Sequence, residues 1–491
     1  MAILAIDAGT TGVTALIVSA DGDILSRGYQ EFAQHFPRPG WVEHDPEEIW
    51  QATLVAVKSA VNKTQVKPTA IGITNQRETA VIWDRKTLAS PTKAIVWQDR
   101  RTSDLTEELQ AKNSGGWITK RTGLNLDPYF TSSKFLWWQK NLQQIFREVV
   151  AGRYALGTID SYLVARLSGG AAHITDASNA SRTQLMDLES MQWDQELCDA
   201  FEIPMSALPK ITPCWGELAI SDPHHFLGLE LPVTGMAGDQ QAALFGQLAF
   251  EAGESKATYG TGAFILTNTG SDIVRSSHGL LSTVGWLSAS GEKTYAIEGS
   301  VFVAGAAVQW LRDGLGIIPT SGAVEALAME VDSSDGVVFL PALTGLGAPF
   351  WDPEIRGSLF GITRGTTKSH IARATLEAIV FQVHAVLEAM ELDMGVELAQ
   401  LRVDGGAAAN DLMMQMQADL LGAKVVRAKN LESTGFGAAL MAGLGAGIWK
   451  EQSELMELNP AAKSFAPLGS RIQDYQRWTK AVTATEHFTK N

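Results

Sequence analysis

One aspartate stands where a catalytic base would be expected. Asp239 lies between a flexible glycine, Gly238, and the start of a helical apolar pattern at residues 240–246. Two short turns rich in glycine and threonine, residues 7–12 and 259–262, each lie between apolar runs of strand character, about half the chain apart. Phosphoryl transfer requires positioning, a divalent cation and a carboxylate that accepts the proton of the attacking hydroxyl. These residues therefore indicate phosphoryl-transfer chemistry.

The two turns are suited to hold phosphate groups. Glycine permits unusual dihedral angles and removes the side chain that would block approach, so backbone N–H groups can converge on phosphate oxygens. The first turn joins two strands, whereas a Walker loop or a dinucleotide fingerprint runs from a strand into a helix. One such turn is more often an ordinary hairpin. One turn in each half of the chain is better explained by phosphates held across a cleft.

Two further features complete the nucleotide and metal site that the sequence predicts. Asp7 ends the first strand beside its turn and would hold Mg²⁺ directly or through water, because this ion prefers few carboxylates and several waters. Residues 401–410 run from an apolar strand through Gly405-Gly406 into a helix, where small residues and free N–H groups suit an adenosine. A tight corner between strand and helix explains that loop equally well.

Arg77 and Glu78 are candidates for binding a substrate. They follow an apolar strand pattern at residues 71–73, and together they could hydrogen-bond the vicinal hydroxyls of a small polyol. The alternative is a surface ion pair. The uninterrupted polar run at residues 74–79, between two apolar segments, is more than a solvated strand face requires.

The length of 491 residues exceeds what a single core supports, so we expect two large domains, residues 1–248 and 249–491. Residues 2–6, 13–18 and 24–25 read as a strand meander, and residues 256–259 and 263–267 repeat the strand-turn-strand pattern in the second half. Helical spacing predicts helices over residues 46–61, behind Asp45 as N-cap, and 369–390. The class is α/β, with the same architecture in both halves and a ligand cleft between them.

Composition excludes several other classes. The formal net charge of −15 argues against nucleic acid as a partner, because such binding depends on clustered lysine and arginine. Two cysteines, Cys198 and Cys214, have no metal-ligand spacing and favour a reducing compartment with buried thiols. No signal segment precedes the first strand, and the apolar stretch at residues 435–449 is too short to span a bilayer. We expect a cytoplasmic protein without integral membrane association.

The chain resembles the FGGY family of carbohydrate kinases nearly end to end, and within it the glycerol kinases. The matching stretches are residues 39–46, 72–79, 127–130, 179–183, 237–247, 344–353 and 401–410. The resemblance implies two actin-like, ribonuclease H-like α/β domains that flank a nucleotide and substrate cleft. It also implies ATP and Mg²⁺ in that cleft and ATP-dependent conversion of glycerol to glycerol 3-phosphate.

The resemblance also assigns roles to individual residues. Asp239 is the expected base, and with Asp7 it would hold the metal. Glycerol-binding positions are matched by Arg77, Glu78, Tyr129, Asp239 and Gln240, with Trp97 and Phe264 packing the carbon chain. Nucleotide-contacting positions are matched by Thr10, Thr11, Gly12, Thr261, Gly305, Gln309, Gly406 and Asn410.

The chain departs from the family pattern near the first turn. Ala8 and Thr14 stand where most glycerol kinases have glutamine and arginine, so a phosphate-facing cation is missing. This leaves open a kinase for another short polyol, such as erythritol, threitol or dihydroxyacetone, or an ATP-binding sensor that has lost transfer chemistry. The resemblance also implies a homodimer or homotetramer.

One histidine raises the question of regulation. His225, in the sequence at residues 224–228, is similar to the histidine that the phosphotransferase carrier HPr phosphorylates in some relatives, although a plain surface histidine remains the alternative. The loop that binds fructose 1,6-bisphosphate in other relatives is not visible before residues 231–233.

Overall fold

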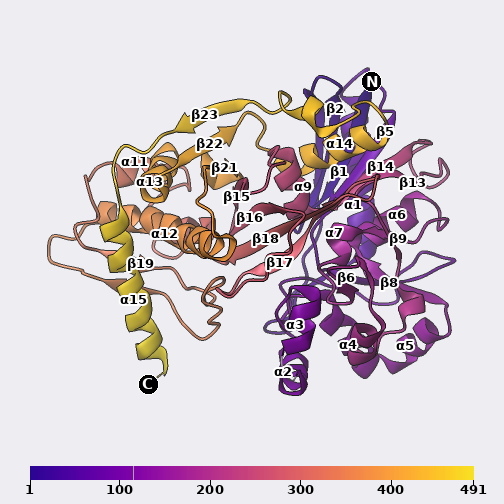
Figure 1. The fold of residues 1–491 in the computed structure, drawn as a ribbon, viewed down its shortest axis with the longest axis horizontal. Coiled ribbons are helices and arrows are strands. Elements are labelled where there is room, and N and C mark those ends of the chain that lie inside the picture. The colour runs from indigo at the N-terminus through magenta and orange to yellow at the C-terminus, as the bar shows by residue number, and fades with distance from the viewer. Residues whose placement is uncertain (114–115, 491) are drawn as a thin grey trace.

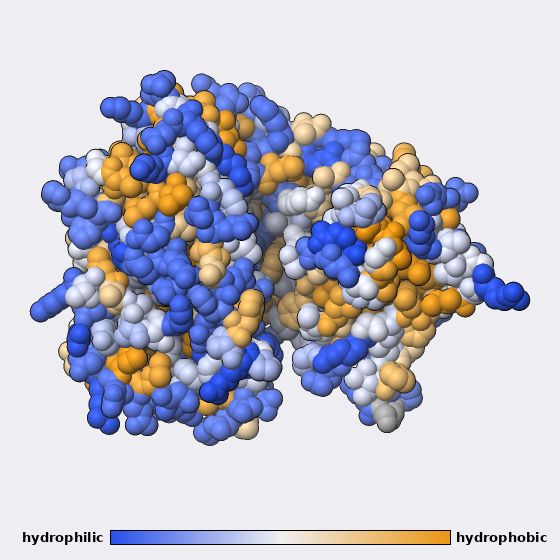
Figure 2. Space-filling view, turned by 180° about the vertical axis from the view of Figure 1, so that it is seen from behind, coloured by the Kyte–Doolittle hydropathy of each residue, from blue (hydrophilic) through white to orange (hydrophobic). Residues whose placement is uncertain are grey.

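The computed structural model describes residues 1–113 and 116–490. It has two α/β lobes, each built around one large β-sheet (Figure 1). The space-filling view from behind shows a deep hollow between the two lobes (Figure 2). The two-lobed α/β class predicted from the sequence is confirmed, and so is the expected cleft between the halves.

The first sheet has six strands in the spatial order β13-β14-β5-β1-β2-β3. Its strands are β1 (Ala2–Ala8), β2 (Gly12–Ser19), β3 (Ile24–Glu31), β5 (Ala70–Asn75), β13 (Trp215–Ile220) and β14 (Pro232–Gly238). The first three strands form an antiparallel meander, whereas β5 and β14 continue the sheet parallel to β1. The predicted meander is confirmed. Its strands β1 and β2 are apolar and almost fully buried because both faces of the sheet are covered there, whereas β3 at the edge alternates buried and exposed residues.

The second sheet has seven strands in the order β17-β18-β16-β15-β21-β22-β23. They are β15 (Ser255–Tyr259), β16 (Ala263–Gly270), β17 (Leu281–Leu287), β18 (Lys293–Val301), β21 (Gln400–Asp404), β22 (Lys424–Ala428) and β23 (Ala461–Phe465). Again an antiparallel run, β15-β16-β18, is followed by the parallel strands β21 and β22. The duplicated architecture expected from the two turns is therefore present.

Smaller sheets accompany the two large ones. They consist of β4 (Glu43–His44), β7 (Ala94–Ile95), β6 (Ala80–Asp84) and β8 (Tyr154–Thr158); β9 (Ile174–Asp176) with β12 (Lys210–Thr212); β10 (Met186–Asp187) with β11 (Gln192–Trp193); and β19 (Val338–Leu340) with β20 (Ser358–Phe360). Short 3₁₀ helices lie at η2 (Met205–Ala207), η3 (Gly406–Ala409) and η4 (Gln452–Leu455).

The helices that come first in the chain are α1 (Pro46–Asn62), α2 (Ser103–Lys112), α3 (Trp117–Thr122), α4 (Thr131–Asn141), α5 (Gln143–Val150), α6 (Ile159–Leu167), α7 (Ala177–Ala180), α8 (Gln195–Ala200) and α9 (Asp239–Gly246). The later ones are α10 (Gly305–Asp313), α11 (Ala323–Ala328), α12 (Lys368–Met394), α13 (Asp411–Leu421), α14 (Ser433–Gly445) and α15 (Ile472–Lys490). The two helices predicted from spacing are α1 and α12. Asp45 caps α1 as expected, with Oδ1 accepting from the Glu47 N–H at 2.9 Å.

Helix α14 crosses from the second half of the sequence onto the first sheet, where Figure 1 draws it in yellow-orange over the indigo strands. Glycines make this close approach feasible. A Cβ on Gly72 of β5 would lie 2.2 Å from the Ala438 carbonyl oxygen, and one on Gly437 would lie 1.8 Å from the Ala242 carbonyl oxygen of the neighbouring helix α9. Most of the apolar stretch at residues 435–449 thus belongs to this packing helix. Within the described residues, no helix has both the length and the apolar character needed to cross a bilayer.

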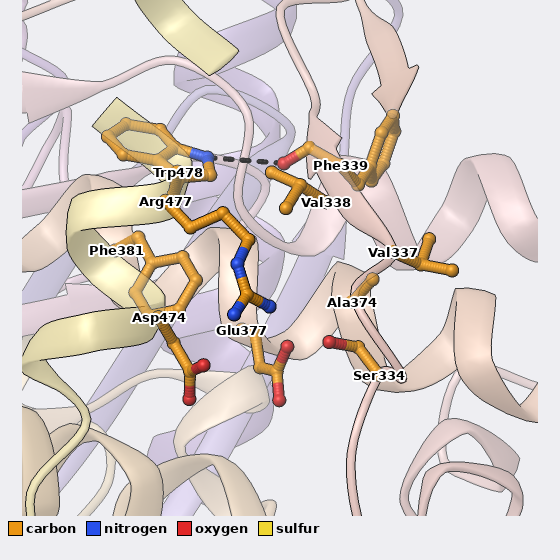
Figure 3. A pocket seen from close by; sticks show the side chains of 10 residues that line it. All are labelled: Ser334, Val337, Val338, Phe339, Ala374, Glu377, Phe381, Asp474, Arg477 and Trp478. Carbon is orange, nitrogen blue, oxygen red and sulfur yellow. Dashed lines mark hydrogen bonds between the residues drawn. The ribbon is translucent and has the colours of Figure 1, made fainter. Parts of the chain in front are cut away.

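Helix α15 packs against the second lobe on the side away from α14 (Figure 1). Figure 3 shows the pocket where it meets α12 and β19: the Trp478 Nε1–H donates to the Phe339 carbonyl oxygen at 3.2 Å, and Phe381 lies beside the indole. Both cysteines are buried, as expected from the sequence.

Candidate active site

The carboxyl ends of three adjacent parallel strands bring the candidate catalytic residues together. In the registers of β1, β5 and β14, Asp7 and Ala237 both lie beside Thr74, and Gly238 lies beside Asn75. Asp7 therefore lies near the end of β1, Asp239 follows β14, and Arg77 lies just beyond β5, the strand between them. Ligands of open α/β sheets bind beyond such strand ends, so the sheet topology alone makes this edge a candidate site.

Asp239 begins helix α9 and remains partly accessible, with 27% of its side chain exposed. Its Oδ1 lies 3.0 Å from Arg77 Nε and accepts a hydrogen bond from the Gln240 N–H at 2.7 Å. Burial raises the pKa of this carboxyl, while Arg77 and Lys256 oppose the rise. A partly exposed carboxylate with a raised pKa is suited to accept a proton from an alcohol.

Asp7 is close enough to Asp239 for the two carboxylates to repel each other. Burial first, and then Asp239 and Glu432, raise the pKa of Asp7 to about 8, against a smaller lowering by Arg27. A divalent cation would relieve that repulsion, and two carboxylates completed by water and phosphate oxygens are a donor set that Mg²⁺ accepts. Residues 1–113 and 116–490 contain no cluster of three or more histidine, cysteine, aspartate or glutamate ligands. The two aspartates thus fit Mg²⁺ only together with a substrate phosphate.

Arg77 and Glu78 are buried, each with 1% of its side chain exposed, so the surface ion pair considered for them is excluded. Glu78 adopts a left-handed backbone with φ of +59°. Such a conformation is costly for a residue other than glycine and is found where the surrounding structure enforces it. The pair therefore occupies a specified interior position beside Asp239.

Three aromatic rings line the same region. Trp97 meets Tyr129 edge to face at a centroid distance of 5.6 Å and Phe264 at 6.2 Å. Phe264 belongs to β16 of the second sheet, whereas Trp97 and Tyr129 come from the first half of the chain. The Trp97 Nε1–H also donates to Thr10 Oγ1 at 3.0 Å. The aromatic group is thus assembled from both halves and tied to the first phosphate turn.

The remaining polyol candidate, Gln240, is held by a buried lysine. Lys256 Nζ donates to Gln240 Oε1, to Thr258 Oγ1 at 3.0 Å and to the Phe264 carbonyl oxygen at 3.3 Å. Burial lowers the pKa of Lys256 to about 8, against the raising effect of Asp404 and Asp239. Sequence reasoning missed Lys256, although a lone lysine at the start of an apolar strand was a usable signal.

The nucleotide candidates fall into two groups. Thr10 and Thr11 lie in the connection from β1 to β2, and Gly12 begins β2. The others gather at the carboxyl ends of β15 and β21, where Thr258 and Asp404 are register partners. There the Gly305 N–H donates to the Gly260 carbonyl oxygen at 3.0 Å, which brings the start of α10, and Gln309 one turn later, to the turn that contains Thr261.

The loop at residues 405–410 joins this second group. Gly405 has φ of +84°, and a Cβ there would lie 2.5 Å from the Tyr259 carbonyl oxygen, so the loop passes directly against the second turn. A 3₁₀ helix precedes α13 where the sequence indicated direct entry into a helix. Asn410 caps α13, with Oδ1 accepting from the Met413 N–H at 2.8 Å. Gly406 is exposed and open to a ligand.

Two residues that depart from the family pattern lie in the first sheet. Ala8 is fully buried in β1, and Thr14 is the register partner of Asp7 in β2. His225 lies on the surface outside these strand ends, with half of its side chain exposed and Nε2 4.0 Å from Asp222 Oδ2.

Because of Glu298, we expect the stability of the protein to depend on pH in the acid range. Burial would raise the pKa of this carboxyl, but Arg182 and Arg77 outweigh burial and lower the pKa from 4.5 to about 2. Because the folded-state pKa is the lower one, the contribution to stability is complete above pH 4.5 and is lost as the pH falls toward 2. These two pKa values correspond to about 3 kcal/mol.

We therefore expect the free energy of unfolding in urea to fall more steeply for the wild type than for Glu298→Gln between pH 4.5 and pH 2. Equal slopes for the two proteins would contradict this assignment.

The fold and the site together define a two-lobed α/β phosphotransferase. The model of the FGGY family of carbohydrate kinases, N-terminal domain, matches residues 2–246, and the model of its C-terminal domain matches residues 255–446. This chain belongs to the FGGY family of carbohydrate kinases.

Comparison with individual proteins shows which kinases of this family the chain is similar to. The chain is 50% identical to a glycerol kinase of Bdellovibrio bacteriovorus, across 98% of both chains, and 50% identical to a glycerol kinase of Dechloromonas aromatica, across 99% of this chain and 98% of the relative. Among solved structures, Plasmodium falciparum glycerol kinase with ADP matches with a TM-score of 0.93 and 37% identity, covering 99% of this chain and 98% of that one. A gluconate kinase from Lactobacillus acidophilus shares the fold with a TM-score of 0.87 at 22% identity.

Proposed function

We propose that this chain is an ATP-dependent glycerol kinase that converts glycerol to sn-glycerol 3-phosphate. The single observation that supports this most is the buried Arg77-Glu78 pair beside Asp239, with a group of aromatic rings from both halves of the chain. Adjacent donor and acceptor groups suit two vicinal hydroxyls, and rings suit a short carbon chain. The similarity to glycerol kinases over nearly the whole chain supports the same substrate.

In this proposal Asp239 accepts the proton of the terminal hydroxyl of glycerol as the oxygen of that hydroxyl attacks the γ-phosphorus of ATP. The bond between the γ-phosphorus and the β,γ-bridging oxygen breaks, and ADP leaves with that oxygen. Arg77 and Glu78 hold the other two hydroxyls, and Trp97 and Phe264 pack against the carbons. Mg²⁺, held by Asp7 and Asp239, would offset the charge of the phosphates when bound. Backbone N–H groups of the two glycine turns orient the phosphate chain, and closure of the two lobes excludes water that would otherwise hydrolyse ATP.

The same proposal includes three properties that rest on the family resemblance. They are a cytoplasmic location, assembly as a homodimer or homotetramer, and phosphorylation of His225 by HPr. The half-exposed imidazole of His225 is compatible with modification.

A coupled ADP-release assay over a panel of polyols tests the function. We expect glycerol to have the highest kcat/KM, and erythritol and threitol to be roughly 10- to 100-fold poorer, because an extra buried hydroxyl without a partner costs about 1–3 kcal/mol. Faster turnover of a four-carbon polyol would identify a kinase for that substrate. Absence of ADP release with every polyol would favour an ATP-binding sensor.

A further inference from the structure

Two buried charged residues outside the candidate polyol-binding set contact three of its members. Glu298, on β18 of the second sheet, is fully buried and accepts from Arg77 Nη1 at 2.6 Å and Arg77 Nη2 at 2.9 Å. Arg182, which follows α7, is also fully buried and donates from Nη2 to Glu298 at 3.1 Å. Glu298 is thus shared by two arginines that approach it from the first half of the chain.

Arg182 also contacts two further members of the candidate polyol-binding set, Glu78 and Tyr129. Its Nε donates to Glu78 Oε1 at 2.6 Å, and its guanidinium carbon lies 5.7 Å from the centroid of the Tyr129 ring. A guanidinium over an aromatic ring is attractive, and the attraction is strongest where water is excluded. Arg182 therefore orients both the carboxylate and the phenol ring that we assign to the polyol.

The bidentate contact with Glu298 decides which edge of Arg77 faces the site. Both terminal nitrogens of Arg77 are engaged by Glu298, so its Nε is the atom that lies beside Asp239 at 3.0 Å. Paired hydrogen bonds between a guanidinium and a carboxylate fix the plane of both groups. Without Glu298 the guanidinium could rotate toward the two nearby carboxylates, Glu78 and Asp239.

We propose that Glu298 and Arg182 are positioning residues that hold Arg77, Glu78 and Tyr129 in the geometry that binds the polyol, and so determine polyol affinity. This inference rests on the proposed function. It also makes polyol binding depend on the second lobe, because Glu298 is supplied by β18, whereas the three side chains that it and Arg182 orient come from the first half of the chain.

Four variants of the full-length protein test the inference. Glu298→Gln removes the charge and keeps the shape, and Glu298→Asp keeps the charge on a shorter side chain. Arg182→Lys keeps the positive charge but lacks the planar guanidinium with its several N–H donors. The matched control is Glu377→Gln, another buried carboxylate of the second lobe that accepts from Arg471 at 3.1 Å, outside the candidate site. KM for glycerol, KM for ATP, kcat and the melting temperature are measured for each.

We expect kcat/KM for glycerol to fall on the order of 100-fold in Glu298→Gln and Arg182→Lys, as small misplacements of binding groups do. The fall should appear mainly as a higher KM for glycerol, with KM for ATP nearly unchanged, and Glu298→Asp should recover part of it. Glu377→Gln should lose melting temperature without a change in KM for glycerol. If Glu298 acts in folding alone, Glu298→Gln will also lose melting temperature without a change in KM for glycerol, and that result would overturn the inference.

Direct binding separates this inference from the proposed function. Calorimetric titration of the nucleotide-free protein with glycerol reports affinity without transfer. A wild type that phosphorylates glycerol, with variants that retain its affinity, overturns the inference alone. A wild type that neither binds nor phosphorylates any polyol of the panel overturns both. If Glu298→Gln does not fold, the glycerol affinity and the glycerol phosphorylation of Arg182→Lys and Glu298→Asp test the inference in its place.

Discussion

Asp239→Asn is expected to lower kcat by roughly 10²- to 10⁴-fold, the usual contribution of a general base. The asparagine keeps the size and the contact with Arg77 but has no basic oxygen for the hydroxyl proton. ATP binding should persist, because the glycine turns and the loop at residues 405–410 are untouched. Stopped-flow transfer assays together with nucleotide titration measure the two quantities separately.

A second aspartate provides the control for that prediction. Asp194 also begins a helix, with Oδ1 accepting from the Leu197 N–H at 2.9 Å, but it caps α8 outside the site. Asparagine is an equally good N-cap, and the partly exposed pair of Asp194 with Arg121 at 2.9 Å contributes no more than about 1 kcal/mol, so Asp194→Asn should retain normal kcat with at most that loss of stability. Near-normal turnover in Asp239→Asn would refute the assignment of Asp239 as the base.

Arg77→Met is expected to destabilise the protein by about 3–5 kcal/mol and to abolish polyol turnover, because removing one partner of a buried ion pair leaves the other charge uncompensated. Three carboxylates surround this guanidinium: Glu298 at 2.6 Å, Asp239 at 3.0 Å and Glu78 at 3.9 Å. Urea denaturation measures the loss of stability, and the coupled assay measures turnover.

The double variant Arg77→Met/Glu298→Gln distinguishes charge from shape. Neutralising Glu298 should recover part of the stability lost in Arg77→Met, without recovering activity. The control is Arg27→Met. Arg27 is exposed and pairs with the exposed Glu432 at 2.9 Å, so its loss should cost no more than about 1 kcal/mol. Equal stability of Arg77→Met and the wild type would show that Arg77 is not the centre of the buried network.

Local sequence signals were sufficient to predict the elements that carry the chemistry. Asp239 follows a glycine at the start of an apolar helical pattern, and that pattern is helix α9. The antiparallel meander followed from the closely spaced strand patterns at residues 2–6, 13–18 and 24–25, and the N-cap of α1 followed from Asp45 before Pro46. Each of these features depends on residues that are close together in the chain.

The partners of the candidate residues could not be predicted in the same way. Glu298 is 221 positions from Arg77 in the sequence, and nothing around it specifies which strand end it meets. A lone glutamate in the apolar run of β18 could have been suspected of having a buried partner, but only the topology of the two sheets identifies that partner. The destination of α14 is missed for the same reason, because its small residues indicate close packing without naming the surface.

The crossing of α14 has a consequence for the synthesis of the protein. The apolar residues Ile3, Leu16 and Val18 of the first sheet belong to one buried cluster with Phe436 and Leu440 of α14. During translation these side chains leave the ribosome more than four hundred residues before the helix that covers them. The nascent first lobe therefore exposes these apolar side chains until elongation is nearly complete. A chaperone that binds this face would protect it from aggregation until α14 is synthesised and packs against it.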